Sequence, residues 1–437
     1  MKYFLAALFV IVSPLVAAQE NVLSFNPESG FYTDSVEVII NSAVSGEIYY
    51  TLDGSIPDSS DQKYNSAIVL NKTRVLRAIL YSDELPDSVV HTSTYFINEE
   101  TTLPVVSIST NPENFFSNET GIYVEGTNGI TGYCSNSPRN WNQDWERPVY
   151  LSYFGEDKEN KFNINAGVKI GGGCTRLYDE KSLDIYFRSQ YGESKLRYHL
   201  FEDKDIDTFN RLSLRSGGQD WYRAIIRNSA LQTITRNSMD LGFQSYKMVI
   251  VFLNGEYWGI HILREKQNED FLESNYGFDA DSIDILKLNQ EIKEGSADHY
   301  KNMIDFIKNN DLSVKENYEW VGTQMDIDQY IDYQIAEIFF ANGDWPGGNI
   351  IYWKPQKPDA KWRWLMYDLD MGFGSHSYGE YDTNSLELAS SETEVYYANP
   401  TWSTFLFRNL LKNEEFRNEF MQRYNIHMVS TFDKDRM

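Results

Sequence analysis

The chain has 437 residues, of which 64 are acidic and 39 are basic, giving a formal net charge of −25. Such a charge repels the phosphates of nucleic acids, so we expect no nucleic-acid partner. The 6 histidines are scattered without a pair at metal-ligand spacing, which argues against a zinc site. With 2 cysteines, the fold must rest on apolar burial rather than on a disulfide framework.

Residues 1–18 have the pattern of a secretory signal peptide. Lys2 precedes an apolar run from Phe4 to Val16, and Ala17 and Ala18 supply the small residues of a cleavage site. The run is shorter than the ~20 apolar residues that a spanning helix needs, and no later segment approaches that length. We therefore expect no transmembrane segment and a mature protein that is secreted or held at the cell surface.

The next 77 residues, 22–98, have the pattern of a small β-sandwich. Strand-like runs alternate with turns rich in Asp, Gly, Ser and Pro, at the spacing of an Ig-like sandwich. The runs cover residues 36–40, 47–51, 66–70 and 73–81. The segments Phe25–Tyr32, Tyr50–Pro57 and Thr94–Ile97 resemble the chitobiase/hexosaminidase C-terminal-type module. This resemblance implies an accessory role, with polysaccharide as the candidate partner of the module.

A second domain is expected over residues 103–437, opening with a strand at 104–109. Cys134 and Cys174 can pair in an exported protein, which would tie a loop to the glycine-rich turn Gly171–Gly173; the sequence leaves the pairing open. The glycines permit close approach of backbone N–H groups to phosphates, and an ordinary hairpin turn is the alternative.

Two cations after the glycines are candidates for contacting phosphates. Lys181 opens a run in which Leu183, Ile185 and Phe187 alternate with polar residues. This places it where the β3 lysine of a kinase reaches the α- and β-phosphates. The guanidinium of Arg176 is the second candidate. The helix-like segment 221–241 lacks the Glu that would pair with such a lysine. Asp220 and Glu265 are the candidate partner acids, and the alternative is that Lys181 is held differently. Glu265 is alternatively a hinge residue.

An acidic loop and an acidic pair form the strongest candidate site. Asp344 and Asn349 are separated by four residues, after an amphipathic helix that begins near Ile327 and before a predicted hairpin over 350–353 and 362–367. Asp368 and Asp370 follow the second strand and share one face by its two-residue period. This order matches the catalytic base and metal ligands of protein kinases.

The site chemistry predicted from these residues is phosphoryl transfer. Asp344 is the candidate catalytic base for an acceptor hydroxyl. Asn349, with Asp368 or Asp370, supplies the oxygen ligands that Mg²⁺ prefers, and Mn²⁺ is an alternative. Asp368 is favoured as the main ligand because it comes first after the strand, although Asp370 is not excluded.

The second domain resembles the CotH kinase family, named for spore coat protein H. The motifs that carry the resemblance are Ala166–Arg176, Lys181–Arg188 with Tyr191-Gly192, Asn254–Glu265 and the segments around Asp344 and Asp368. The resemblance implies an α+β chain: an Ig-like β-sandwich followed by an atypical bilobal protein-kinase-like domain. It also implies transfer of the ATP γ-phosphate to Ser, or Thr, of exported, coat or surface proteins, with Lys181 as a catalytic and ATP-binding residue.

The C-terminal segment 405–423 is predicted to form one or two helices, and the charged segment 308–319 a solvated connection between helices. Members of the family usually continue with further helices, so we expect the sequence to be a fragment that ends early at Met437. Two rival functions remain open. One is an inactive coat or surface scaffold that binds carbohydrate, and the other is an AMP transferase on the same fold.

Overall fold

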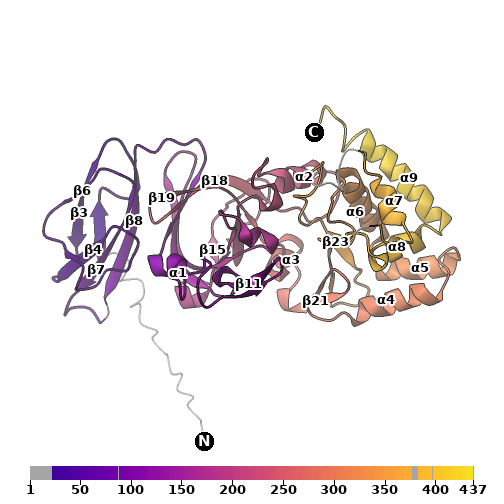
Figure 1. Cartoon of the computed structure of the whole chain (residues 1–437), viewed down its shortest axis with the longest axis horizontal. Helices are drawn as coiled ribbons and strands as arrows, with labels where there is room; N and C mark the ends of the chain where they lie inside the picture. The colour runs from indigo at the N-terminus through magenta and orange to yellow at the C-terminus, as the bar shows by residue number, and fades with distance from the viewer. Residues whose placement is uncertain (1–21, 87, 376–381, 396, 437) are drawn as a thin grey trace, which may run out of the picture. The chain divides into compact units, whose positions relative to one another are not determined.

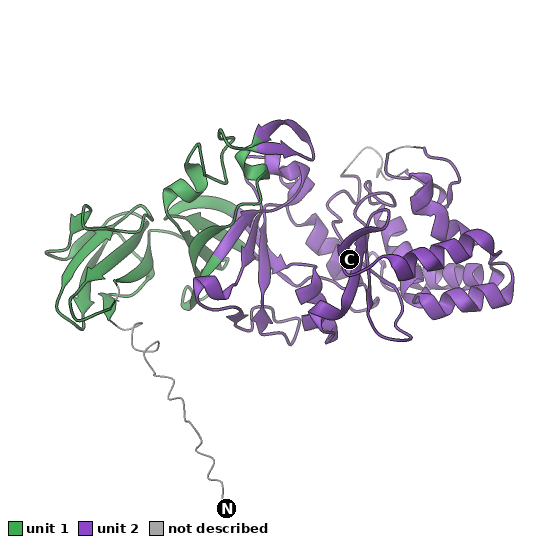
Figure 2. Ribbon diagram, turned by 90° about the horizontal axis from the view of Figure 1, so that it is seen from below, with its two compact units in different colours: residues 1–129, 139–166, 249–259 green, residues 130–138, 167–248, 260–437 purple. Residues whose placement is uncertain are grey.

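The computed structural model describes residues 22–86, 88–375, 382–395 and 397–436, so the predicted signal peptide lies outside the described residues. Figure 2 shows the two compact units of the chain. The first contains Met1–Gly129, Arg139–Ala166 and Val249–Gly259, and the second contains Ile130–Pro138, Gly167–Met248 and Ile260–Met437. These units divide the chain differently from the sequence-based ranges 22–98 and 103–437.

The first unit opens with the predicted sandwich, which lies at the indigo end of Figure 1, where β3, β4, β6, β7 and β8 are labelled. One sheet has the order β1-β3-β6 and the other has the order β2-β8-β7-β4-β5. The strands are β1 (Leu23–Asn26), β2 (Gly30–Tyr32), β3 (Val36–Ser42), β4 (Glu47–Thr51), β5 (Gln62–Lys63), β6 (Ile68–Leu70), β7 (Arg74–Tyr81) and β8 (Val89–Ile97).

Alternation of side chains explains why these strands stack as two sheets. In β3, Val36, Val38 and Ile40 are buried, whereas the residues between them are exposed. They belong to one apolar cluster that also holds Leu76 and Leu80 of β7, in the other sheet. Burying both inner faces against each other is what stabilises a sandwich of this size.

The remainder of the first unit continues from the sandwich through β9 (Val105–Ser109). This strand pairs antiparallel with β12 (Arg147–Phe154) and parallel with β18 (Tyr246–Leu253). Phe96 of β8 and Val105, Phe154 and Phe252 form one buried cluster. The helix α1 (Pro112–Phe116) also belongs to this unit.

A closed barrel has the strand order β12-β13-β14-β17-β19-β18-β9. Its long strands include β13 (Asn160–Ile170), β18 and β19 (Glu256–Glu265). In the second unit, β17 (Arg211–Arg215) pairs with β14 (Leu183–Tyr186) and with β19. The short hairpins are β10 (Ile130–Gly132) with β11 (Ser135–Arg139), and β15 (Leu196–Arg197) with β16 (Thr208–Phe209).

The helix-like segment predicted over 221–241 is shorter in the structure. The helix α2 covers Arg227–Thr235 only. Before it, Gly217 and Gly218 have positive φ and lead into a single 3-10 turn, and Ile225 also has a left-handed φ of 66°. Left-handed residues cannot continue a right-handed helix, which explains the later start. The next helix is α3 (Glu269–Tyr276).

The second unit continues with a four-stranded antiparallel sheet and six further helices among the described residues. The sheet order is β21 (Glu291–Glu294), β20 (Ile283–Lys287), β22 (Ile351–Pro355), β23 (Arg363–Leu365), which confirms the predicted hairpin. The helices are α4 (Asp298–Asn309), α5 (Lys315–Gln324), α6 (Ile327–Phe340), α7 (Ser385–Ser390), α8 (Thr401–Leu410) and α9 (Glu414–Met428).

Two expectations for these helices have different outcomes. The C-terminal segment forms the two helices α8 and α9, as predicted. The charged segment 308–319 is not entirely a connection, because α5 begins at Lys315. Buried Tyr318 and Val321 fix this helix to the core, and an i,i+4 pair of Lys315 with Glu319 lies on its surface.

The helix α6 positions the acidic loop that follows it. The side chain of Asp326 caps its N-terminus by accepting a hydrogen bond from the N–H of Gln329. Ten of its 14 residues are buried, and it packs against α7, α9 and β23. The chain is therefore α+β, with a β-sandwich followed by a mixed helix and strand domain. None of the helices in the described part of the chain is long and apolar enough to cross a membrane.

Candidate active site

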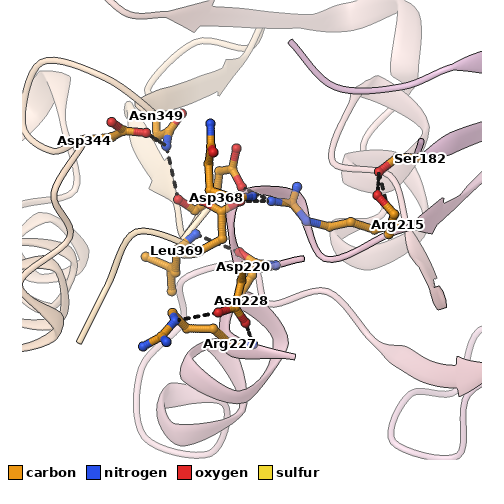
Figure 3. Close-up of polar contacts among 12 residues, drawn as sticks. Ser182, Arg215, Asp220, Arg227, Asn228, Asp344, Asn349, Asp368 and Leu369 are labelled. Carbon is orange, nitrogen blue, oxygen red and sulfur yellow. Dashed lines mark hydrogen bonds and ion pairs between the residues drawn. The ribbon is translucent and has the colours of Figure 1, made fainter. Parts of the chain in front are cut away.

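The loop after α6 holds Asp344 and Asn349 together. The N–H of Gly348 donates to the carbonyl of Asp344 at 2.6 Å and closes the turn. The Asn349 Nδ2 donates to Asp344 Oδ2 at 3.0 Å and to the carbonyl of Asp368 at 3.2 Å, as Figure 3 shows. The loop and the segment after β23 are thus joined by one amide side chain.

Asp368 and Asp370 do not lie on a strand, so the argument from a two-residue period is wrong. The strand β23 ends at Leu365, and Asp368 has a left-handed φ of 55° that turns the chain. The two carboxylates nevertheless meet, because Nη2 of Arg215 donates to both. Its distance to Asp368 Oδ1 is 2.6 Å, and it also contacts Asp370 Oδ2.

Asp370 is the more deeply buried of the two acids, with 2% of its surface exposed. The N–H of Gln219 also donates to its Oδ2, at 2.8 Å. Burial, followed by the negative charge of Asp368, raises the pKa of Asp370 to about 7, while Arg215 opposes the shift. A nearby cation would favour its ionised form.

Gly218 allows Arg215 to reach this position. Its φ is +67°, and a Cβ there would lie 2.1 Å from Arg215 Nη2 and 2.2 Å from Asp370 Oδ2. Our sequence reasoning found neither Gly218 nor Arg215. The sequence pattern that could have indicated them is an Arg at the end of a strand followed closely by two glycines. This pattern can be assigned to the site only when the acids that contact the Arg are known.

The start of α2 fixes the chain between the two acids. Asn228 Oδ1 accepts the N–H of Leu369 at 2.7 Å. Asp220 accepts from Nε of Arg227 at 3.1 Å and from its backbone N–H at 3.1 Å (Figure 3). These contacts make Asp220 a structural partner of α2.

Both candidate partner acids of Lys181 are engaged with other cations. Asp220 pairs with Arg227, and Glu265 pairs with Lys204 at 2.5 Å in a largely buried ion pair. Lys181 is itself buried, and its Nζ donates to the carbonyl of Tyr178 at 2.6 Å. The kinase-type pairing of Lys181 with Asp220 or Glu265 is therefore absent from this structure.

The remaining phosphate candidates gather around the glycine-rich turn. Gly171 N–H donates to the carbonyl of Ser182, and Arg176 Nε donates to the carbonyl of Gly172, each at 2.7 Å. Gly172 has a φ of +83°, which favours glycine, and a 3-10 turn over Cys174–Leu177 follows it. Cys174 forms a disulfide with Cys134, so the turn is tied to the β10–β11 hairpin.

One hydrogen-bond chain connects this turn to the acids. The backbone carbonyl of Tyr178 accepts the hydrogen bond from Lys181, and the Tyr178 hydroxyl donates to Gln219 Oε1 at 2.5 Å. The N–H of Gln219 then donates to Asp370. The structure therefore connects Lys181 to the acidic site through Tyr178 and Gln219, whereas the direct cationic partner of the acids is Arg215.

Arg264 on β19 is a further cation that the sequence reasoning missed. It is buried, and its Nε and Nη1 have no hydrogen-bond partner in the described structure. Burial, followed by the charge of Arg215, lowers its pKa to about 10. The charge of Asp368 opposes this shift, so the two arginines and this acid interact.

The oxygen atoms at the site fit a hard divalent cation with few protein ligands. No three Asp, Glu, His or Cys side chains of the described chain meet closely enough to form a metal site by themselves. The available oxygen ligands are the carboxylates of Asp368 and Asp370 and the Oδ1 of Asn349. The Nδ2 of Asn349 donates to Asp344 and Asp368. Two carboxylates and an amide are a set that Mg²⁺ takes when phosphates and water complete its shell.

A tyrosine hydroxyl lies on the candidate base. Tyr397 Oη donates to Asp344 Oδ1 at 2.7 Å, on the oxygen that Asn349 does not contact. The side chain of Tyr397 is exposed. A general base needs the hydroxyl of its acceptor at this same position, within hydrogen-bond distance of the carboxylate.

A buried helix, an acidic loop closed by Asn, and a hairpin followed by two acids occur in the order that the sequence predicted for a kinase-like class of protein. Within that class, the family model for CotH kinase protein matches residues 168–437, and the chain belongs to this family. The model for the chitobiase/beta-hexosaminidase C-terminal domain matches residues 27–93. Both resemblances seen in the sequence are thereby confirmed. Comparison with curated proteins gave no match.

Proposed function

We propose that this protein is a secreted atypical kinase that transfers the γ-phosphoryl group of ATP to Ser or Thr of exported or surface proteins. Membership of the CotH kinase family supports kinase activity as the general class. The observation that carries the proposal is the convergence of Asp344, Asn349 and Asp368 through the two hydrogen bonds of one amide.

In the proposed mechanism Asp344 orients the acceptor hydroxyl and takes its proton. Its Oδ2 is fixed by Asn349, which leaves Oδ1 for the acceptor once the Tyr397 hydroxyl is displaced. Asn349, Asp368 and Asp370 would hold Mg²⁺, which when bound neutralises charge on the transferred phosphoryl group. Such catalysis is mostly positioning and electrostatic stabilisation.

The nucleotide phosphates would meet the cations of the glycine-rich turn. We propose Lys181 and Arg176 as phosphate contacts, with backbone N–H groups of Gly171–Gly173 beside them. Arg215 is added to this set because it already binds the two acids next to which the phosphates would lie. A guanidinium suits bidentate phosphate contact.

The test is autophosphorylation of the purified protein with γ-labelled ATP and Mg²⁺. Asp344→Asn and Asp368→Asn should abolish the label, and Glu316→Gln, which changes a solvent-exposed acid on α5, should keep it. A matched assay with α-labelled ATP distinguishes AMP transfer, which would leave label from that nucleotide on the protein. Absence of label together with absence of a nucleotide-induced thermal shift would contradict the kinase proposal and favour the scaffold.

For the N-terminal module we propose polysaccharide binding. The match to a chitobiase/beta-hexosaminidase C-terminal domain supports it. Retention of the full chain on insoluble chitin or cellulose, compared with a matched inert resin, tests it. Equal retention on all three materials would contradict the proposal.

A further inference from the structure

A cavity of about 460 Å³ opens beside the loop that carries Asp344. Its walls come from α4, α6, α8, the turn between β20 and β21, and residues Trp345 and Pro346. On α4, Tyr300, Ile304 and Lys308 follow one another at four-residue spacing and so line it from one face of the helix. The volume falls within the range of cavities that bind small molecules or peptide side chains.

Aromatic rings dominate the cavity wall. Six of them are Tyr300, Tyr330, Trp345, Tyr352, Trp364 and Trp402. Several are already packed edge to face or stacked on each other, such as Tyr352 on Trp364 with ring centroids 5.9 Å apart. A rigid wall of this kind favours a flat ring over a flexible aliphatic chain, because the ring loses little conformational freedom on binding.

A buried hydrogen-bond acceptor lines the same cavity. Gln334 on α6 is 4% exposed, and its Oε1 has no partner in the described structure. An unsatisfied buried amide oxygen costs roughly 1–3 kcal/mol. This atom is covered in the structure, so a ligand that carries a hydrogen-bond donor on an aromatic body would remove the cost once the Gln334 side chain turns Oε1 into the cavity.

The charge of the cavity is opposite to that of the chain. Of its lining residues in the described structure, two are charged, and both are basic: Lys308 and Arg408. Their acidic neighbours, Asp305 at 2.9 Å and Glu392 at 3.8 Å, are themselves exposed. Exposed pairs of this kind are weak, so an incoming carboxylate can compete for either cation.

The position of the cavity connects it to the proposed acceptor site. Trp345 and Pro346 directly follow Asp344 and form part of the wall. The wall also includes Thr401, Trp402 and Ser403. The chain leading to them carries Tyr397, which bonds Asp344, and Ala398, whose carbonyl accepts the N–H of Gly347.

We propose that this cavity binds a Tyr or Trp side chain of the acceptor polypeptide, flanked by acidic residues and lying a few positions from the phosphorylated Ser or Thr. The inference rests on the proposed kinase function and names its substrate class. The ring packs against the aromatic wall, and its O–H or N–H donates to Gln334. Acidic neighbours pair with Lys308 and Arg408.

The experiment is phosphorylation of a peptide library in which each peptide has one Ser, one variable residue at a scanned position and flanking Asp or Lys. Tyr or Trp at one or two positions, with Asp beside it, should lower the KM for peptide at least several-fold relative to Ala, while the KM for ATP stays constant. Equal phosphorylation of peptides with and without an aromatic residue would overturn the inference.

Variants localise the effect to the cavity. Gln334→Met keeps the side-chain size and should remove the preference for Tyr over Phe. The double variant Lys308→Glu, Arg408→Glu should change the flanking preference from Asp to Lys. Lys301→Glu makes the same charge change at an exposed site on α4 outside the cavity and should change neither preference. Unchanged preferences in the cavity variants would count against the inference.

Two further readouts keep the outcomes distinct. If Gln334→Met fails to fold, as judged by circular dichroism, Trp402→Ala replaces it and should weaken peptide binding measured by calorimetry with a Tyr-Asp-Asp peptide. If N-acetyltyrosine amide binds as tightly as that peptide, the cavity is a small-molecule site and the inference is wrong. Absence of both labelling and a nucleotide thermal shift contradicts the kinase function instead.

Discussion

The hydroxyl of Tyr397 occupies the oxygen of Asp344 that an acceptor would need. We predict that Tyr397→Phe raises the rate of peptide phosphorylation by roughly two- to tenfold, because the acceptor no longer has to displace a hydrogen bond of about 1 kcal/mol. The change should appear in the KM for the acceptor. Steady-state kinetics with labelled ATP measures it, and a fall in rate would mean that Tyr397 assists catalysis instead.

A single glycine controls how Arg215 reaches the acids. Gly218→Ala should reduce activity by at least tenfold, because the added methyl would collide with Arg215 and Asp370 and because the positive φ disfavours alanine. Gly322→Ala on α5 is the matched control, since its Cβ would meet only Ile327, at 3.8 Å. Both variants are compared by initial rate and by melting temperature. Equal activity of the two would contradict this account of Gly218.

At the level of single residues, the sequence predicted that Asp344 and Asn349 lie together but did not predict the cation that binds Asp368 and Asp370. Asp344 and Asn349 are close in sequence, so their spacing is legible as a loop. Arg215 pairs with acids 153 and 155 positions away, and this pairing depends on two glycines and a left-handed Asp368. No local pattern encodes a contact of that length, which explains why Arg215 was not among the predicted site residues.

The end of α6 is strained in a way that a substitution can relieve. Ala341 ends the helix in the left-handed conformation, with φ 47° and ψ 50°, a position that usually holds glycine. Ala341→Gly should stabilise the protein by roughly 0.5–1 kcal/mol, because the strain removed exceeds the added entropy of the unfolded chain. Ala336→Gly, in the buried middle of the same helix, should destabilise it by ~1 kcal/mol or more. Denaturant unfolding of the two variants should therefore shift in opposite directions.

The interior of α6 also contains an acid whose protonation affects stability. Glu337 is buried, Asn342 Nδ2 donates to its Oε2 at 3.1 Å, and burial raises its pKa from 4.5 to about 8. The folded state therefore keeps a proton that the unfolded chain releases, so this group lowers stability as pH rises from about 4.5 to about 8.

We predict that Glu337→Gln flattens this dependence. The unfolding free energy of the variant minus that of the parent should be larger at pH 8 than at pH 5, by on the order of a few kcal/mol. Urea unfolding at the two pH values measures the difference. A parent and variant with the same slope would show that Glu337 is ionised in the folded protein.

At the level of elements, alternation and helical periodicity predicted the sandwich strands, the hairpin β22–β23 and the helices α6, α8 and α9. The failures lie where the backbone leaves regular structure. Residues 367–371 have an apolar-polar alternation, yet Asp368 is left-handed and the strand ends at Leu365. In 221–241 the first residues form a turn, because the backbone N–H groups of Ala224 and Arg227 donate to the Asp220 carboxylate rather than along a helix.

For the whole molecule, the disulfide is the single covalent tie outside the backbone. Cys134 and Cys174 are 40 residues apart and join the hairpin β10–β11 to the glycine-rich turn. Cys134→Ser with Cys174→Ser should destabilise the protein by roughly 2–4 kcal/mol, because the loop closure is lost from the unfolded state. Thermal unfolding with and without reductant checks it. Reductant should lower the melting temperature of the parent to that of the variant and leave the melting temperature of the variant unchanged.

The double resemblance in the sequence identified both parts of the chain, but the division of the structure was not predictable from it. Phe96 at the end of the sandwich packs with Val105, Phe154 and Phe252, which come from three later strands. Because these apolar residues are spread over more than 150 positions, no composition change in the sequence marks where the first unit ends.

Arg215 pairs with both acids of the candidate site and offsets part of their charge, so the protein carries its own counter-ion there. In many small metal-binding domains, the fold collapses when a chelator removes the cation, because nothing else offsets the ligands' charge. Here the guanidinium fills that role. We predict that the melting temperature is the same in EDTA and in Mg²⁺ without nucleotide. Folding and shelf life would then be independent of metal supply, and only turnover would respond to it.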